Sequence, residues 1–230
     1  MKNNLLIVLM LLIIGVGCKH AINPNAKINS EKHIDDVIKG NNEFEKTVYN
    51  VIRWYNDKNQ DSLNSLIDDK TGLYLIYRRG THDAENNLNK ICLSSNCIYE
   101  ENIPDWVQES IKKQKIKIDY TISYENYPTF QNCEVASKDG LYIDTLKVDR
   151  FLTETIKNYK TVYAPESLYT DLEIKILIEK ASKVENNSRK IILTKNQGGY
   201  YSGHFIFYLT KFDDKWYLTI IDFASLDCSV

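Results

Sequence analysis

The stretch GHFIFYLTKFDDKWYLTIID, residues 203–222, is the most informative part of the chain. We interpret it as two strands joined at Asp213 and Asp214, because apolar side chains alternate along both arms. A two-residue turn sets three cross-strand pairs: Leu209 with Leu218, Phe207 with Ile220, and Phe205 with Asp222.

This alternation divides the hairpin into two faces, and a slip of one residue would mix them. The first face holds Phe205, Phe207, Leu209, Trp216, Leu218 and Ile220 and ends at Asp222. The second face holds His204, Ile206, Tyr208, Thr210, Tyr217, Thr219 and Ile221. We expect the hairpin to form the floor of the core. If the second face is wet, an aspartate at Thr219 should cost less stability than one at Leu218.

The N-terminus has the features of an export signal. Lys2 precedes an apolar run over residues 5–17, which is shorter than the roughly 20 residues that a membrane-spanning helix needs. The run ends in Gly-Val-Gly before Cys18, which resembles the lipobox of bacterial lipoproteins. That resemblance implies lipidation of Cys18, and Lys19 favours the outer membrane as destination. An ordinary cleaved signal or an uncleaved anchor is the alternative.

We therefore divide the chain into a signal peptide (1–17), a polar tether (18–42) and a single domain (43–230). A domain of that length can bury a sizeable core. The formal net charge of −2 argues against a nucleic-acid partner, which would require a basic surface.

Periodicity predicts a sequence of helices and strands along the domain. Helical spacing or an opening proline favours helices over 44–55, behind Asn41 or Asn42 as cap, over 61–67, from Pro104, and over 145–159. Alternation predicts strands over 72–77, 115–124, 172–178 and 189–194, with a hairpin turn at Asn186-Asn187 and a bend at Gly198-Gly199.

This order predicts an α+β domain with helices on a curved, mainly antiparallel sheet that ends in a four-strand meander. The segments 43–67 and 72–77 and the closing FYLTKFDDKWYLTIID resemble the NTF2-like and cystatin-like superfamily. In that superfamily an N-terminal helix pair precedes a strand, and the last strands form a long meander. A shared fold does not by itself assign a function.

The cysteines favour disulfides over metal or thiol chemistry. No HExxH motif, paired CxxC or Gly-x-Ser-x-Gly sequence is present, so we expect no metal site and no nucleophilic serine. Exported proteins usually oxidise their thiols. The short spacing favours a Cys92–Cys97 bridge, which leaves Cys133 to pair with Cys228. The alternative is four reduced, buried cysteines.

Acid–base catalysis is the enzymatic alternative. The fold resemblance implies a cavity like that of ketosteroid isomerases and scytalone dehydratase, where buried Asp, His or Tyr side chains transfer protons. Asp222, on an apolar face, and His204, on the opposite one, are the candidates for this chemistry. The plainer interpretation is that Asp222 lies at a strand end and caps the turn at Ala224-Ser225.

From these observations we expect a lipoprotein of the bacterial cell envelope with a binding or accessory role and no cofactor. Its partners would be the membrane, through the lipid anchor, and a small molecule or an envelope protein. A cofactor-free isomerase or dehydratase is the first alternative, and an inhibitor or immunity protein is the second.

Overall fold

The computed structural model describes residues 42–97, 99, 103–116, 120–124, 139–144, 151–158, 170–194 and 204–226. The predicted signal peptide, nearly all of the predicted tether, Cys18, Cys133, Cys228 and the predicted Gly198-Gly199 bend lie outside these residues. The domain boundaries and the second disulfide therefore stay predictions.

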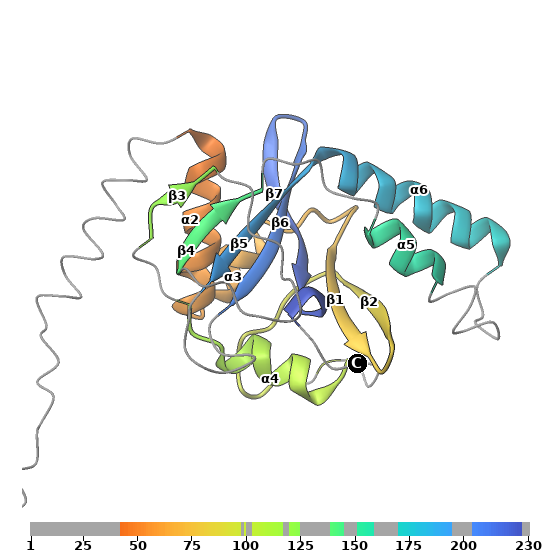
Figure 1. Ribbon diagram of the computed structural model, residues 1–230, viewed down its shortest axis with the longest axis horizontal. Coiled ribbons are helices and arrows are strands. Elements are labelled where there is room, and N and C mark those ends of the chain that lie inside the picture. The colour runs from red at the N-terminus through yellow and green to blue at the C-terminus, as the bar shows by residue number, and fades with distance from the viewer. Residues whose placement is uncertain are drawn as a thin grey trace, which may run out of the picture.

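The described residues form an α+β domain built on a mixed seven-stranded sheet (Figure 1), so the expected class is confirmed. The strands are β1 (Leu73–Arg79), β2 (His82–Leu88), β3 (Ile122–Ser123), β4 (Gly140–Ile143), β5 (Ser188–Thr194), β6 (Phe205–Phe212) and β7 (Lys215–Asp222). Their order in the sheet is β2-β1-β7-β6-β5-β4-β3. The pairs β1–β7 and β3–β4 are parallel, and the other pairs are antiparallel.

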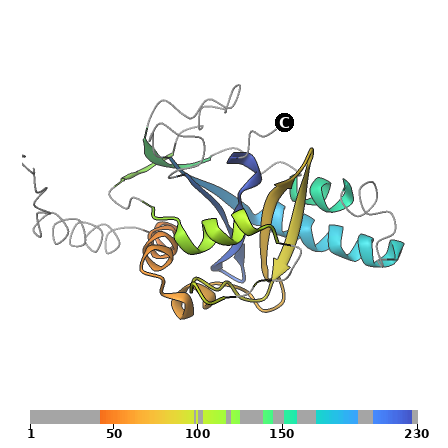
Figure 2. The ribbon, with the colours of Figure 1, turned by 90° about the horizontal axis from the view of Figure 1, so that it is seen from below.

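Helices cover both faces of this sheet (Figure 2). They are α2 (Glu43–Asn56), α3 (Gln60–Asn64), α4 (Asp105–Lys113), α5 (Phe151–Asn158), α6 (Asp171–Asn187) and the short 3-10 helix η2 (Ala224–Leu226). One core cluster joins α2, α3 and α4 to the first face. A second joins α5 and α6 to the opposite face. The second face of the terminal hairpin is therefore dry, contrary to the wet face that we considered.

Helix α2 forms where the sequence predicts it. The Asn42 side chain accepts a hydrogen bond from the backbone N–H of Glu45 at 3.1 Å, which satisfies a donor that the first turn leaves open. The buried side of α2 packs on the sheet through aromatic side chains. The ring centroids of Phe44 and Trp216 lie 4.6 Å apart.

The terminal hairpin forms around the predicted turn, but its register changes along the strands. Asp213 and Asp214 have φ values of 45° and 64°, as a type I′ turn requires, and Leu209 pairs with Leu218. A bulge then shifts the register between Tyr208 and Leu209. Beyond it the pairs are Tyr208 with Ile220, Phe207 with Ile221, and Ile206 with Asp222.

The bulge makes two predicted pairs and their face assignments wrong. An extra residue in one strand turns the following side chains to the other face. Ile221 therefore joins the first core cluster, and Ile220 joins the second. Thr219, at the irregularity, is buried, and its hydroxyl lies 2.6 Å from the hydroxyl of Thr210.

The predicted strand over 172–178 is wrong, because these residues belong to α6. A capping box starts this helix: the Thr170 side chain accepts from the Glu173 N–H, and the Glu173 carboxylate accepts from the Thr170 N–H. Ala181 and Val184 then bury one side of it. The helix ends at Asn187 and β5 begins at once, so no hairpin turn forms there. The expected four-strand meander is therefore reduced to β5, β6 and β7.

The predicted strand over 115–124 is also mostly wrong among the described residues, since only Ile122 and Ser123 are in β3. At Ile116 the side chain of Asn56 takes the place of a neighbouring strand. It accepts from the Ile116 N–H at 2.7 Å and donates to the Ile116 carbonyl at 2.6 Å. These bonds satisfy the backbone of Ile116 without a ladder.

Candidate functional site

The register shift gathers the predicted site residues on one face of the sheet, under α5 and α6. Asp222 pairs with Ile206 in the antiparallel ladder, and Tyr208 lies two positions along the same strand face. Both Tyr208 and Asp222 are buried, with 2% and 1% of their surface exposed. Phe151 of α5 stacks on the Tyr208 ring, with centroids 5.4 Å apart. The expectation that Asp222 and Tyr208 lie on opposite faces is therefore wrong.

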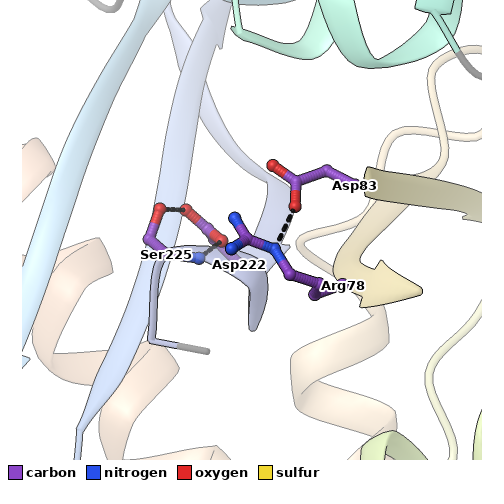
Figure 3. A network of polar contacts seen from close by, with 4 residues as sticks. All are labelled: Arg78, Asp83, Asp222 and Ser225. Atoms are coloured by element: carbon purple, nitrogen blue, oxygen red, sulfur yellow. Dashed lines mark hydrogen bonds and ion pairs between the residues drawn. The ribbon is translucent and has the colours of Figure 1, made fainter. Parts of the chain in front are cut away.

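Both carboxylate oxygens of Asp222 accept hydrogen bonds from Ser225 (Figure 3). Oδ1 accepts from the backbone N–H at 2.9 Å, and Oδ2 accepts from the hydroxyl at 2.5 Å. Asp222 thus caps the turn that begins η2, as the plainer interpretation of the sequence proposes. This geometry gives the carboxylate a structural task.

Arg78 and Asp83 extend this network to the β1–β2 hairpin. Asp222 pairs with Ile76 in the parallel ladder, and Arg78 follows two residues later on the same face. Figure 3 shows the Arg78 guanidinium pointing toward the Asp222 carboxylate. The Arg78 Nε atom lies 2.9 Å from Oδ1 of Asp83, and both side chains are partly exposed. The network therefore connects the edge of the sheet to the terminal turn.

Tyr208 is the titratable group most strongly affected by this site. Burial raises the pKa of its hydroxyl well above the ordinary value, and the Asp222 and Asp144 carboxylates and a hydrogen bond to Asp222 raise the pKa further. Glu185 adds a smaller contribution in the same direction. The hydroxyl therefore stays neutral at physiological pH and acts as a hydrogen-bond donor.

Glu185 places a second buried carboxylate beside this site. One of its oxygens accepts from the backbone N–H of Thr153 at 2.9 Å, within the first turn of α5. An anion at a helix N-terminus is favourable, because the free N–H groups there carry partial positive charge. Burial nevertheless raises the pKa of Glu185 above its ordinary value. Glu185 thus joins α6 to α5 over Tyr208.

His204 is buried on the same face of the sheet at the start of β6. Burial lowers the pKa of its imidazole, and the nearby Asp139 carboxylate acts in the opposite direction. The side-chain amide of Gln114 donates a hydrogen bond to the His204 carbonyl. His204 precedes Ile206 by two residues in the same extended segment, so the two side chains share a face. Ile206 pairs with Asp222, and His204 therefore lies on the same face as Asp222.

The Cys92–Cys97 pair lies in the loop after β2 and is joined by a disulfide, with Cα atoms 6.0 Å apart. The Tyr99 hydroxyl fixes this loop: it donates to the Cys92 carbonyl at 2.5 Å and accepts from the Cys92 N–H at 3.0 Å. Within the described ranges, no three His, Cys, Asp or Glu side chains are grouped so as to hold a metal ion.

Sequence reasoning missed the role of Glu185 and the contact between Tyr208 and Asp222. A signal for the first was present, because Thr170 and Glu173 have the spacing of a capping box and mark the start of α6. Recognising that helix would have placed Glu185 on the same side as Ala181. The contact depends on the bulge, for which the sequence carries no comparable signal.

Comparisons with known proteins give no relative for this chain: no family model, no curated protein and no solved structure matches it. No helix among the described residues is long and apolar enough to span a bilayer.

Proposed function

We propose that the protein is a lipoprotein of the bacterial cell envelope, anchored at the outer membrane, whose domain binds a ligand or partner there. The short apolar run before Cys18 supports export and lipidation. The domain would then work at a membrane surface, held by the tether.

The observation that supports the binding role best is that Asp222 is already hydrogen-bonded within the protein. This side chain is the strongest candidate for acid–base chemistry in the sequence, yet both of its oxygens bind Ser225. A general base needs a lone pair within reach of a substrate proton. Asp222 is also only 1% exposed, so the site supports a structural network more than a catalytic one. Binding of another molecule would then depend on side chains at the molecular surface.

Among the residues that the structure describes, four large apolar side chains are exposed on the molecular surface. They are Trp106 (39%), Tyr124 (46%), Leu172 (67%) and Ile176 (54%). Single exposed apolar residues are common on soluble proteins, but Leu172 and Ile176 lie one turn apart on α6. Adjacent exposed apolar side chains are typical of contact surfaces.

We also propose that the domain is NTF2-like or cystatin-like in its general form. The helix pair α2–α3 precedes β1, and β5, β6 and β7 follow one another as antiparallel neighbours at the end of the chain. Helices α5 and α6 on the opposite face are an addition to the pattern on which the resemblance rests.

A cofactor-free isomerase or dehydratase is the second candidate, favoured by the buried Tyr208 hydroxyl beside the Asp222 carboxylate. A neutral tyrosine can donate a proton or a hydrogen bond to a developing oxyanion. In that case the protein would have to open around Asp222 when a substrate binds, because this side chain is only 1% exposed.

Thermal unfolding of the full chain in intact cells and after purification tests the binding role. A ligand or partner that binds only the folded state raises the midpoint by mass action. We expect a higher midpoint in cells, and we expect Trp106→Ser or Ile176→Ser to reduce the difference. Equal midpoints in cells and in buffer would contradict a binding role.

A further inference from the structure

The N-terminal half of α6 exposes an apolar pair that the domain does not cover. The helix runs past the edge of the sheet (Figures 1 and 2), and its buried residues are Ala181, Val184 and Glu185, all in the C-terminal half. Leu172 and Ile176 are 67% and 54% exposed. Ala181 follows Leu172 by about two and a half turns, so the exposed pair points away from the buried side.

The helix is nevertheless well defined at this end. The capping box between Thr170 and Glu173 stabilises the first turn from within the chain. A helix interior is neutral or mildly unfavourable for isoleucine, so propensity does not explain Ile176 at an exposed position. Leu172 and Ile176 therefore lie exposed on a well-formed, capped helix.

The charges around the pair suit an anionic lipid surface. The side of the helix that carries Leu172 and Ile176 also carries three lysines, Lys175, Lys180 and Lys183, and two carboxylates, Glu173 and Glu179, which leaves one positive charge in excess. Lysines can place their stems along apolar groups while the ammonium reaches lipid phosphates. Leucine or isoleucine beside lysine is the composition of helices that lie in the membrane interface.

A second copy of the chain fits this face less well. A stable protein interface buries about 1,200 Å² or more, and two side chains on one helix supply only a small part of that area. A bilayer does not need so large a contact when the protein is already attached to it. Attachment makes docking intramolecular, and a high effective concentration then supports a weak contact.

The tether is long enough for such docking. Twenty-three residues separate Cys18 from Asn42, where the described chain begins. Fully extended, they would span about 80 Å, so α6 can reach the bilayer wherever the anchor lies. We infer that the Leu172–Ile176 face of α6 docks on the bilayer that holds the anchor and orients the domain there, an inference that rests on the proposed lipidation of Cys18.

Photochemical crosslinking of the full chain in the membranes of the expressing bacterium tests this inference. A diazirine amino acid replaces Ile176 in one variant and Glu109 in a control. Glu109 is exposed on α4, away from α6 (Figure 1). After irradiation, intact-mass analysis should show severalfold more phospholipid adduct at position 176 than at position 109.

A second variant adds Leu172→Glu to the chain with the photoreactive residue at 176. Because Leu172 is largely exposed, the fold should persist while the lipid adduct falls severalfold. Equal lipid yields at 176 and 109, or adducts at 176 only with protein, including a second copy of this chain, would overturn the inference. The mass of the Cys18 peptide in the same samples separates the two failures: a lipidated Cys18 with equal yields rejects only the docking.

Discussion

Replacing Asp222 by alanine tests the structural role of the carboxylate. The change removes the acceptors for the Ser225 N–H and hydroxyl and leaves the buried Tyr208 hydroxyl without the Asp222 carboxylate. Hydrogen bonds to a charged group contribute about 1.5–3 kcal/mol, and an unsatisfied buried hydroxyl costs about 1–3 kcal/mol. We therefore expect Asp222→Ala to lower the free energy of unfolding by about 3–5 kcal/mol, measured by urea denaturation at pH 7.

Two variants calibrate this result. Asp222→Asn keeps the volume and one acceptor oxygen, so its expected loss is smaller, about 1–2 kcal/mol. Asp83→Asn breaks the Arg78–Asp83 ion pair, whose side chains are 27% and 33% exposed, and should cost about 1 kcal/mol or less because solvent screens the pair. If Asp222→Ala costs no more than Asp83→Asn, Asp222 does not hold the terminal turn, and the catalytic alternative gains support.

Three further predictions concern the two faces of the terminal hairpin, the buried Glu185 and the cysteines. Leu218→Asp and Thr219→Asp should each cost about 3 kcal/mol or more in urea denaturation, because both sites are fully buried; a small loss at Thr219 alone would mean that its face is wet. Since burial raises the pKa of Glu185, its contribution to stability is complete below the ordinary glutamate pKa and is lost as the pH rises through the raised value. The unfolding free energy of the wild type minus that of Glu185→Gln should therefore fall as the pH rises from about 4, and a rise would contradict the burial argument. Non-reducing peptide mapping should find Cys133 joined to Cys228, and free thiols at both would reject that pairing.

The parts of the fold that the sequence predicted are those governed by local signals. Asn42 caps α2 as its position before an amphipathic stretch suggests, and the two aspartates at 213 and 214 form the turn of the terminal hairpin. Pro104 marks the start of α4. In each case the residue that sets the backbone is adjacent to the element it defines.

The two predicted strands over 172–178 and 115–124 were wrong because apolar side chains alternate there for another reason. Ile174, Ile176 and Ile178 alternate like a strand, but a capping box and the packing of Ala181 make the segment helical. At Ile116 the apolar alternation predicts a strand, but the side chain of Asn56, which is far away in the sequence, hydrogen-bonds the backbone N–H and carbonyl in place of a neighbouring strand. Neither effect is visible in a short window of residues.

The sequence predicts which residues belong to the candidate site better than it predicts how they lie relative to one another. The sequence leaves two interpretations of Asp222, a catalytic carboxylate in an apolar cavity or a strand-end residue that caps the next turn, and its bonds to Ser225 are those of a turn cap. Its position beside Tyr208 depends on one extra residue in β7, and that bulge reverses the face of every side chain beyond it.

The most direct test of the proposed function is the intact mass of the full chain extracted from the membranes of an expressing bacterium. Lipidation predicts a chain that begins at Cys18 and carries the mass of two or three acyl chains, in the outer-membrane fraction. Cys18→Ser should prevent that modification. An unmodified chain released in soluble form from the wild type would contradict the account.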